Sequence, residues 1–168
     1  MHKILSATLA ASVLAAGVAQ AGTTSTTFQV TATVNATCSA AASTLAFPAY
    51  TPGAGAVTGT STITLTCTNG AQPTVALNPG TTTGDAFTQR LMASGTNTLQ
   101  YNLYTSSGYG TVWGDGTGTT KTVQVPTPST GIGTPQTLTV YGQLLDSATN
   151  KNAVPGSYSD LITATVTY

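Results

Sequence analysis

Apolar and polar residues alternate in short runs along most of the chain. Each run places apolar side chains at every second position, which is the period of a half-buried β-strand. The runs fall at residues 28–34, 63–67, 75–77, 99–103, 123–125, 138–140 and 162–166. After the N-terminal region, no segment keeps the apolar period of a helix for more than a turn or two. The pattern therefore predicts an all-β protein.

Turn-forming residues separate these runs. They include Pro52-Gly53, Asn69-Gly70, Asn78-Pro79-Gly80, Gly114-Asp115-Gly116 and Pro155-Gly156. Such residues favour tight turns through positive φ angles, a fixed proline φ or local side-chain hydrogen bonds. About seven short strands joined by turns, with no crossover helix, favour a single immunoglobulin-like β-sandwich over a barrel or an α/β fold.

The N-terminus has the pattern of a signal peptide. His2 and Lys3 precede an apolar stretch at residues 4–16, and the small residues Ala19 and Ala21 flank Gln20. The apolar run is shorter than the ~20 residues needed to cross a bilayer. We expect residues 1–21 to be a signal peptide that is cleaved before Gly22 on export.

Cleavage leaves a mature chain, residues 22–168, with very few charges. It keeps four aspartates and three basic residues, which gives a net charge of 3 − 4 = −1. Three scattered cations cannot form the basic face that nucleic-acid binding requires. The whole sequence is only 5% charged but 40% hydrophobic. This balance suits a subunit packed in a fibre or coat, where charge need not prevent association.

Two cysteines remain in the mature chain, Cys38 and Cys67. An even number of cysteines in an exported protein predicts a disulfide. Closing a loop of about 30 residues is worth roughly 3.5 kcal/mol in the chain-entropy model. A metal pair or a catalytic thiol would lack any histidine partner, so we expect a structural bridge.

Enzymatic chemistry finds little support in the mature sequence, which predicts no catalytic residue, no metal site and no cofactor. Without a histidine, neither a Ser-His-Asp nor a Cys-His arrangement can form. Asp85, Asp115 and Asp146 lie in turn-like settings, which explain them better than paired glycosidase carboxylates do. The loop around Asp115 lacks a second carboxylate for calcium. Trp113 is interpreted as a core aromatic, with a sugar-stacking platform as the alternative.

The two ends of the mature chain raise a question of pairing. Residues 28–34 follow a polar leader and form either an ordinary first strand or a donor strand that completes a neighbouring molecule. At the other end, residues 158–168 are predicted as strand up to Tyr168. If this last strand lies inside a sheet, its outer neighbour is missing. Its alternation places Ile162, Ala164 and Val166 along the resulting groove, an edge that another segment must cover.

Several motifs together resemble the spore coat protein U family, which includes the archaic, Csu-type chaperone–usher pilins. They occur in the order Tyr101-Asn102-Leu103-Tyr104, Val112-Trp113-Gly114-Asp115-Gly116-Thr117-Gly118, Val140-Tyr141-Gly142 and Pro155-Gly156-Ser157-Tyr158-Ser159-Asp160, before an alternating strand that ends at Tyr168. The resemblance covers essentially the whole mature chain. No single motif is specific, but their combination in this order is.

The resemblance implies an incomplete immunoglobulin-like sandwich that lacks its last strand and is completed by a donor strand. Residues 22–35 would be the donor segment, with Phe28, Val30, Ala32 and Val34 inserting, and residues 36–168 the pilin domain. The partners implied are identical or homologous pilin subunits, a periplasmic chaperone and an outer-membrane usher, the only contact with a membrane. Export to the periplasm and then the cell surface, as part of an adhesive pilus that supports biofilm formation, would follow.

Two other functions remain open. The protein could be a secreted spore or cell coat protein of the same family that assembles in the same way. It could also be a lectin-like secreted binding module built around Trp113.

Overall fold

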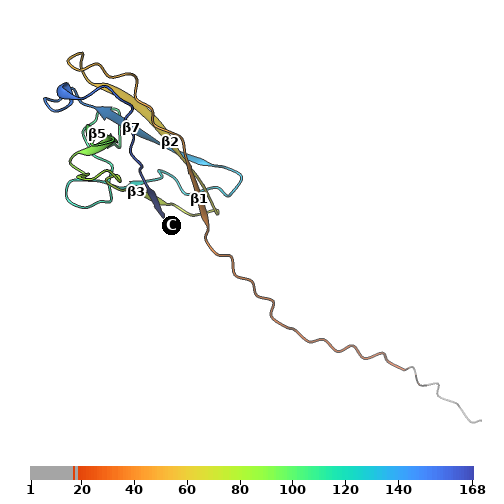
Figure 1. Cartoon of the computed structure of the whole chain (residues 1–168). Helices are drawn as coiled ribbons and strands as arrows, with labels where there is room; N and C mark the ends of the chain where they lie inside the picture. Colours follow the sequence, from red (N-terminus) through yellow and green to blue (C-terminus); the bar gives the residue numbers. More distant parts are fainter. Residues whose placement is uncertain (1–16, 18) are drawn as a thin grey trace, which may run out of the picture. The chain divides into compact units, whose positions relative to one another are not determined.

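The computed structural model describes Gly17 and residues 19–168. The signal peptide predicted over residues 1–21 therefore lies almost entirely outside the described residues, and its cleavage stays a prediction. Val34–Tyr168 forms one compact unit, and the residues before it form a separate one. Residues 19–33 contain no helix or strand (Figure 1). Their side chains are exposed.

The described part of the compact unit is all-β, with one short 3-10 turn. Its elements are β1 (Cys38–Ala42), β2 (Val57–Cys67), β3 (Thr74–Leu77), β4 (Arg90–Ser94), β5 (Asn97–Tyr104), β6 (Val123–Gln124), β7 (Gln136–Leu144), η1 (Asn150–Asn152) and β8 (Ala164–Thr167). The strands form two antiparallel sheets that pack as an immunoglobulin-like sandwich, as the alternating runs predict.

The first sheet has the strand order β1-β2-β7-β5-β4. Its longest pairing joins β2 to β7, from Val57 opposite Leu144 to Leu65 opposite Gln136. In β2, alternate residues from Ser61 to Cys67 are buried, while the residues between them are only half-buried. The sequence therefore fixes both the strand and the face that it buries.

The second sheet is smaller, with the order β6-β3-β8. Strand β3 lies in the middle and pairs with β8 from Thr74 opposite Thr167 to Leu77 opposite Ala164. Strand β8 has β3 on one side and no second strand on the other within the part of the chain that the structure describes. The outer edge of β8 is therefore open among the described residues.

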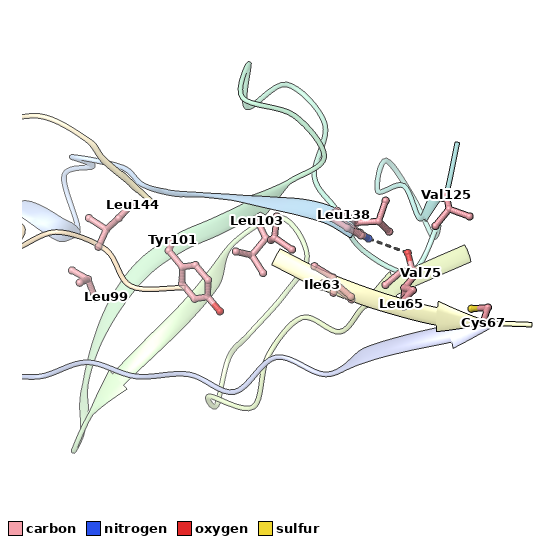
Figure 2. Packing of buried hydrophobic residues seen from close by; sticks show 13 residues of the cluster. Ile63, Leu65, Cys67, Val75, Leu99, Tyr101, Leu103, Val125, Leu138 and Leu144 are labelled. Carbon is pink, nitrogen blue, oxygen red and sulfur yellow. Dashed lines mark hydrogen bonds between the residues drawn. The ribbon is translucent and has the colours of Figure 1, made fainter. Parts of the chain in front are cut away.

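The core lies between the two sheets (Figure 2). Side chains of β2, β5 and β7 meet those of β3 and of the segment that follows β6. Trp113 belongs to this core, since it is 1% exposed and its Nε1 donates a hydrogen bond to the carbonyl of Val75 at 3.0 Å. The sequence interpretation of Trp113 as a core aromatic is confirmed, and a buried ring cannot serve as a sugar platform.

The strands differ from the sequence pattern in several places. Residues 158–168 were expected to be strand up to Tyr168, but β8 covers only Ala164–Thr167, because the residues before it have few backbone partners. Strands β1 and β4 were not predicted, because Cys38–Ala42 is made of small residues, all exposed after Cys38, and Arg90–Ser94 begins with a charged one. Conversely, residues 28–34 have the strongest alternation near the N-terminus but form no strand. Alternation marks a segment that can pair, whereas a strand also requires a partner.

Candidate functional site

A groove of about 940 Å³ opens in the compact unit between two segments that are far apart in sequence. One wall is formed by residues 42–52, which follow β1, and the other by residues 153–164, which lead into β8. The floor is formed by buried side chains of the core, which include Ile63, Leu77, Leu99, Leu103, Val140 and Leu144. The groove is therefore lined mainly by apolar side chains.

The first wall leaves the first sheet just after β1. Ser43 still donates its backbone N–H to the carbonyl of Thr62 at 3.0 Å, but within the described chain residues 44–50 make no backbone hydrogen bond to another segment. Their backbone groups are free to pair with an incoming strand, because buried amides and carbonyls need partners.

Two facing glycines bring the first wall across the inside of the sheet. Gly59 of β2 lies opposite Gly142 of β7. A Cβ at Gly59 would lie 2.8 Å from the carbonyl oxygen of Ala46, and a Cβ at Gly142 would lie 2.8 Å from Leu45 Cδ1. The missing side chains let Leu45 and Phe47 pack onto the core as part of the groove wall.

At one end of the groove, a hydrogen bond joins Tyr50 of the first wall to Asp146, in the loop that follows β7. The Tyr50 hydroxyl donates to Asp146 Oδ1 at 2.6 Å, and the N–H of Gly53 donates to the same oxygen at 2.9 Å. Burial, followed by the bond to Asp146, raises the pKa of Tyr50 to about 12. The bond from Tyr50 is the main cause of a lowered pKa at Asp146. We call this end the tyrosine pole.

Beyond the opposite end, at the far end of the β1–β2 pair from Ala42 and Ile63, lies the disulfide between Cys38 and Cys67, and we call this end the disulfide pole. The first wall runs from this pole to the tyrosine pole. The second wall runs the other way: it starts beside η1 and ends in β8, where Thr167 lies opposite Thr74. Two hydrogen bonds place this end at the disulfide pole. Ser129 N donates to the carbonyl of Ala71, which precedes β3, and Ser129 Oγ donates to the carbonyl of Cys67.

The second wall has a strict two-residue period. Tyr158, Asp160, Ile162, Ala164 and Val166 are half-buried, whereas every residue between them is exposed. Before β8 begins, hydrogen bonds from other segments reach the backbone of this wall only at the pair Ala93–Ser159 and at Thr163. The carbonyl of Thr163 accepts from Asn78 N, and its N–H donates to Asn78 Oδ1. The wall therefore presents a strand-like apolar face and an unpaired edge to the groove.

The structure places the predicted site residues in two separate groups. Ile162 and Ala164 line the groove, and Val166 continues the same face beyond the lining residues. Phe28, Val30 and Val34 are 86%, 81% and 89% exposed, and Ala32 is exposed as well. The insertion of these four side chains into a groove remains a prediction. The predicted disulfide between Cys38 and Cys67 is present.

Sequence reasoning missed the first wall entirely. Leu45 and Phe47 alternate with small residues and precede Pro48, and this short apolar pair was the available signal. Tyr50 gave no signal, because its role depends on Asp146, which is distant in sequence. The sequence predicts no site role for Asp160, but the structure places it on the inward face of the second wall.

The remaining aspartates serve local structure. Asp115 accepts bonds from the N–H and hydroxyl of Thr117, and Asp85 accepts from the N–H groups of Thr82 and Leu91. Among the described residues, no three metal-binding side chains come together. The same residues contain no helix that is long and apolar enough to cross a membrane.

The fold is an immunoglobulin-like sandwich, and its groove lies beside β8, an edge strand among the described residues. The Spore Coat Protein U domain model matches residues 24–165, and the chain belongs to that family. No curated protein matches the chain.

A similar solved structure is the CsuC–CsuE chaperone–tip adhesion subunit pre-assembly complex from the archaic chaperone–usher Csu pili of Acinetobacter baumannii. The TM-score is 0.58 and the identity is 22%, over 81% of this chain and 41% of that chain. The present chain thus spans less than half of that protein, and at this identity the similarity concerns the fold.

Proposed function

We propose that the protein is a structural subunit of a surface pilus that assembles by donor-strand complementation. Residues 22–35 of one copy insert into the groove of the next, with Phe28, Val30, Ala32 and Val34 facing its floor. The observation that carries the proposal is the groove itself, because both of its walls have unpaired backbone edges and an apolar lining. Such a site accepts an added strand rather than a compact ligand.

The N-terminal segment has the chemistry that this groove requires. Phe28, Val30 and Val34 project large apolar side chains into water, whereas Gln29, Thr31 and Thr33 between them are polar. A strand with this pattern covers an apolar floor with one face and keeps the other in solvent. Full burial of each large apolar side chain is worth about 1.5–3 kcal/mol, with less from Ala32.

Chain geometry favours insertion into another copy. The first wall spans about 26 Å between residues 42 and 50 if it is extended. The link from Val34 to Cys38 reaches at most about 14 Å. A segment whose Val34 lay at the tyrosine pole could not belong to the chain whose Cys38 forms the disulfide pole. A strand in that orientation must therefore come from a second molecule.

The family and the similar structure support the wider assignment. A chaperone–subunit complex with the same fold fits a periplasmic chaperone that fills the groove before assembly, and an outer-membrane usher would then polymerise the subunits. The protein would be exported by the signal peptide, cleaved before Gly22 and carried to the cell surface. There it would contribute to attachment and biofilm formation without enzymatic activity. A coat protein assembled through the same groove is the second candidate, favoured by the family's name alone.

Charge substitutions on alternate faces of the donor segment test the proposal. We expect the native chain, expressed in the periplasm, to form SDS-resistant ladders. Phe28→Asp/Val30→Asp should abolish them, because two charges cannot enter an apolar groove. The matched control Gln29→Asp/Thr31→Asp places the same charges on the solvent face and should still polymerise. Deletion of residues 22–34 should act like the first variant. Equal polymerisation of all variants by light scattering, or a folded native monomer, would refute the proposal.

A further inference from the structure

The groove lining contains a single charged side chain among the described residues, Asp160. It occupies the middle of the inward face of the second wall, between Tyr158 and Ile162. Every other inward position of this wall carries an apolar or aromatic side chain. A strand that fills the groove must therefore place one of its own inward side chains against a carboxylate.

The Asp160 carboxylate is held in place from two directions. Oδ1 accepts the backbone N–H of Thr81 at 2.9 Å, with the hydroxyls of Thr81 and Thr82 at 3.3 and 3.4 Å. Oδ2 accepts the Tyr101 hydroxyl at 2.6 Å. In Figure 2 the Tyr101 ring comes from the core with its hydroxyl toward the C-terminal segment. These bonds leave the carboxylate little freedom to turn away from an incoming side chain.

The segment at Gly80 and Thr81, which contacts Asp160, is closely packed and cannot move away from it. A Cβ on Gly80 would overlap the carboxylate oxygens of both Asp160 and Asp85, so the chain passes tightly between them. The neighbouring carbonyl of Asn78 accepts two bonds from the guanidinium of Arg90, which is fully buried. Asp160 is thus one member of a packed polar network, and a bulky apolar group pressed against it would displace its remaining water at a cost.

We infer that Asp160 sets the register of the inserted strand by accepting only the small side chain of Ala32 opposite it. This inference rests on the proposed function. The donor runs antiparallel to the second wall, so that Val34 lies toward the tyrosine pole and the next domain begins beyond that pole. In the opposite direction, the donor's domain would lie at the disulfide pole, beside the residues that precede Cys38 of the acceptor. Two chains could then exchange segments with each other and form a closed pair instead of a fibre.

In the inferred register, the apolar pairs are complementary in size. Val34 lies opposite Tyr158, Val30 opposite Ile162, and the large Phe28 opposite the small Ala164. All three positions belong to the residues that line the groove. Directly opposite residues in an antiparallel pair point to the same face, so these side chains share the groove floor.

The neighbouring registers are worse for identifiable reasons. A slip of one residue turns Gln29 and Thr31 into the groove. A slip of two residues in one direction presses Val30 against Asp160. The slip in the other direction presses Val34 against Asp160 and moves Phe28 to Val166, outside the lining residues.

Paired cysteines in the full-length chain test the register. Two substitutions at the donor positions, Phe28→Cys and Val30→Cys, are combined with two at the wall, Ile162→Cys and Ala164→Cys. The matched pairs F28C/A164C and V30C/I162C should form covalent ladders on mild oxidation. The crossed pairs F28C/I162C and V30C/A164C place the same residues diagonally, where Cα atoms about 7–8 Å apart do not bridge. We expect at least about tenfold less crosslinking from the crossed pairs.

Asp160→Asn tests whether the charge of Asp160 sets the register, because the substitution keeps the size of the side chain and removes the charge. In this background we expect the crossed pairs to gain crosslinking at the expense of the matched ones. Preferential bridging by either crossed pair, or an unchanged pattern in Asp160→Asn, would overturn the inference while the ladders themselves upheld the proposed function. Absence of ladders from every variant, the single-cysteine controls included, would overturn both.

Discussion

The central strands of the first sheet and the last strand of the second sheet differ in their pairing. In the first sheet, β2 and β7 each have neighbours on both sides and share a long register. In the second sheet, β8 pairs with β3 only, and the residues before it face an open groove. The inward faces of both sheets follow the same two-residue period. The difference lies in pairing, which shows that apolar patterning can complete a face without supplying a neighbour.

The largest stability effect should come from Arg90, which links the two sheets. Its guanidinium donates to the carbonyl of Trp113 at 2.8 Å and to Asn102 Oδ1 at 2.6 Å, in addition to the carbonyl that follows β3. A lysine cannot reproduce this fork. Arg90→Lys should lower the free energy of unfolding by about 4 kcal/mol or more, because several buried acceptors lose their donors at about 1–3 kcal/mol each.

Urea unfolding of the donor-charged variant Phe28→Asp/Val30→Asp, with and without Arg90→Lys, measures this effect without polymerisation. Lys151→Met is the control, since Lys151 is exposed and its ion pair with Asp146 is 3.6 Å long. Lys151→Met should change the free energy of unfolding little. Equal effects of the two substitutions would show that Arg90 does not connect the sheets.

The disulfide should have the next largest effect. It joins β1, the outer strand of the first sheet, to β2 at residues that are opposite in register. Cys38→Ser/Cys67→Ser should lower the free energy of unfolding by about 3.5 kcal/mol, through the larger entropy of the open chain. The same urea experiment measures it. Retention of full stability after the double substitution would contradict a structural role for the bridge.

The facing glycines sharpen the comparison at the groove itself. Gly59→Ala meets the rigid backbone oxygen of Ala46, whereas Gly142→Ala meets the movable ends of Leu45 and Phe47. We expect Gly59→Ala to cost about 1–3 kcal/mol by overpacking, and Gly142→Ala to cost less. Thermal unfolding of the two variants ranks them. The reverse ranking would mean that the first wall does not rest on Gly59 as described.

The smallest effect should come from Tyr50, which ties the tyrosine pole. The folded state raises the pKa of Tyr50 to about 12, so this contribution is present below pH ~10 and is lost as the pH rises toward the folded value. The pKa of Asp146 is lowered, so its contribution is present above pH ~4 and is lost as the pH falls through the folded value.

Tyr50→Phe should therefore flatten the pH profile of stability at both ends. Urea unfolding between acid and alkaline pH measures this profile. Tyr168→Phe, at an exposed tyrosine, should leave the profile unchanged. A Tyr50→Phe profile with the native shape would rule out the bond to Asp146 as its source.

Local patterning was enough to predict the sandwich and half of the groove. The alternation of Ile63, Leu65 and Cys67 predicts both a strand and its buried face, and the structure has both. Ile162 and Ala164 were placed on the groove for the same reason. Because the period of a strand is a local property, it can be read from neighbouring residues alone.

Long-range contacts explain what could not be predicted. The first wall depends on Gly59 and Gly142, which meet only because β2 pairs with β7. Asp160 acquires its place through Tyr101, a residue of another strand. Arg90 is buried against the expectation for a charged side chain, since its acceptors come from segments on both sheets. Composition and local periodicity contain none of these relations.

Hydrogen exchange in the native polymer and in Phe28→Asp/Val30→Asp tests the vacancy in the second sheet most directly. The account predicts that the backbone amides of residues 44–47, Ala49, Tyr50, Asp160 and Ile162 exchange fast in the variant and become protected in the polymer, where a donor strand supplies their partners. Amides of β2 and β7, which are paired in both, should exchange alike. Equal exchange of the two groove walls in polymer and variant would contradict the central claim.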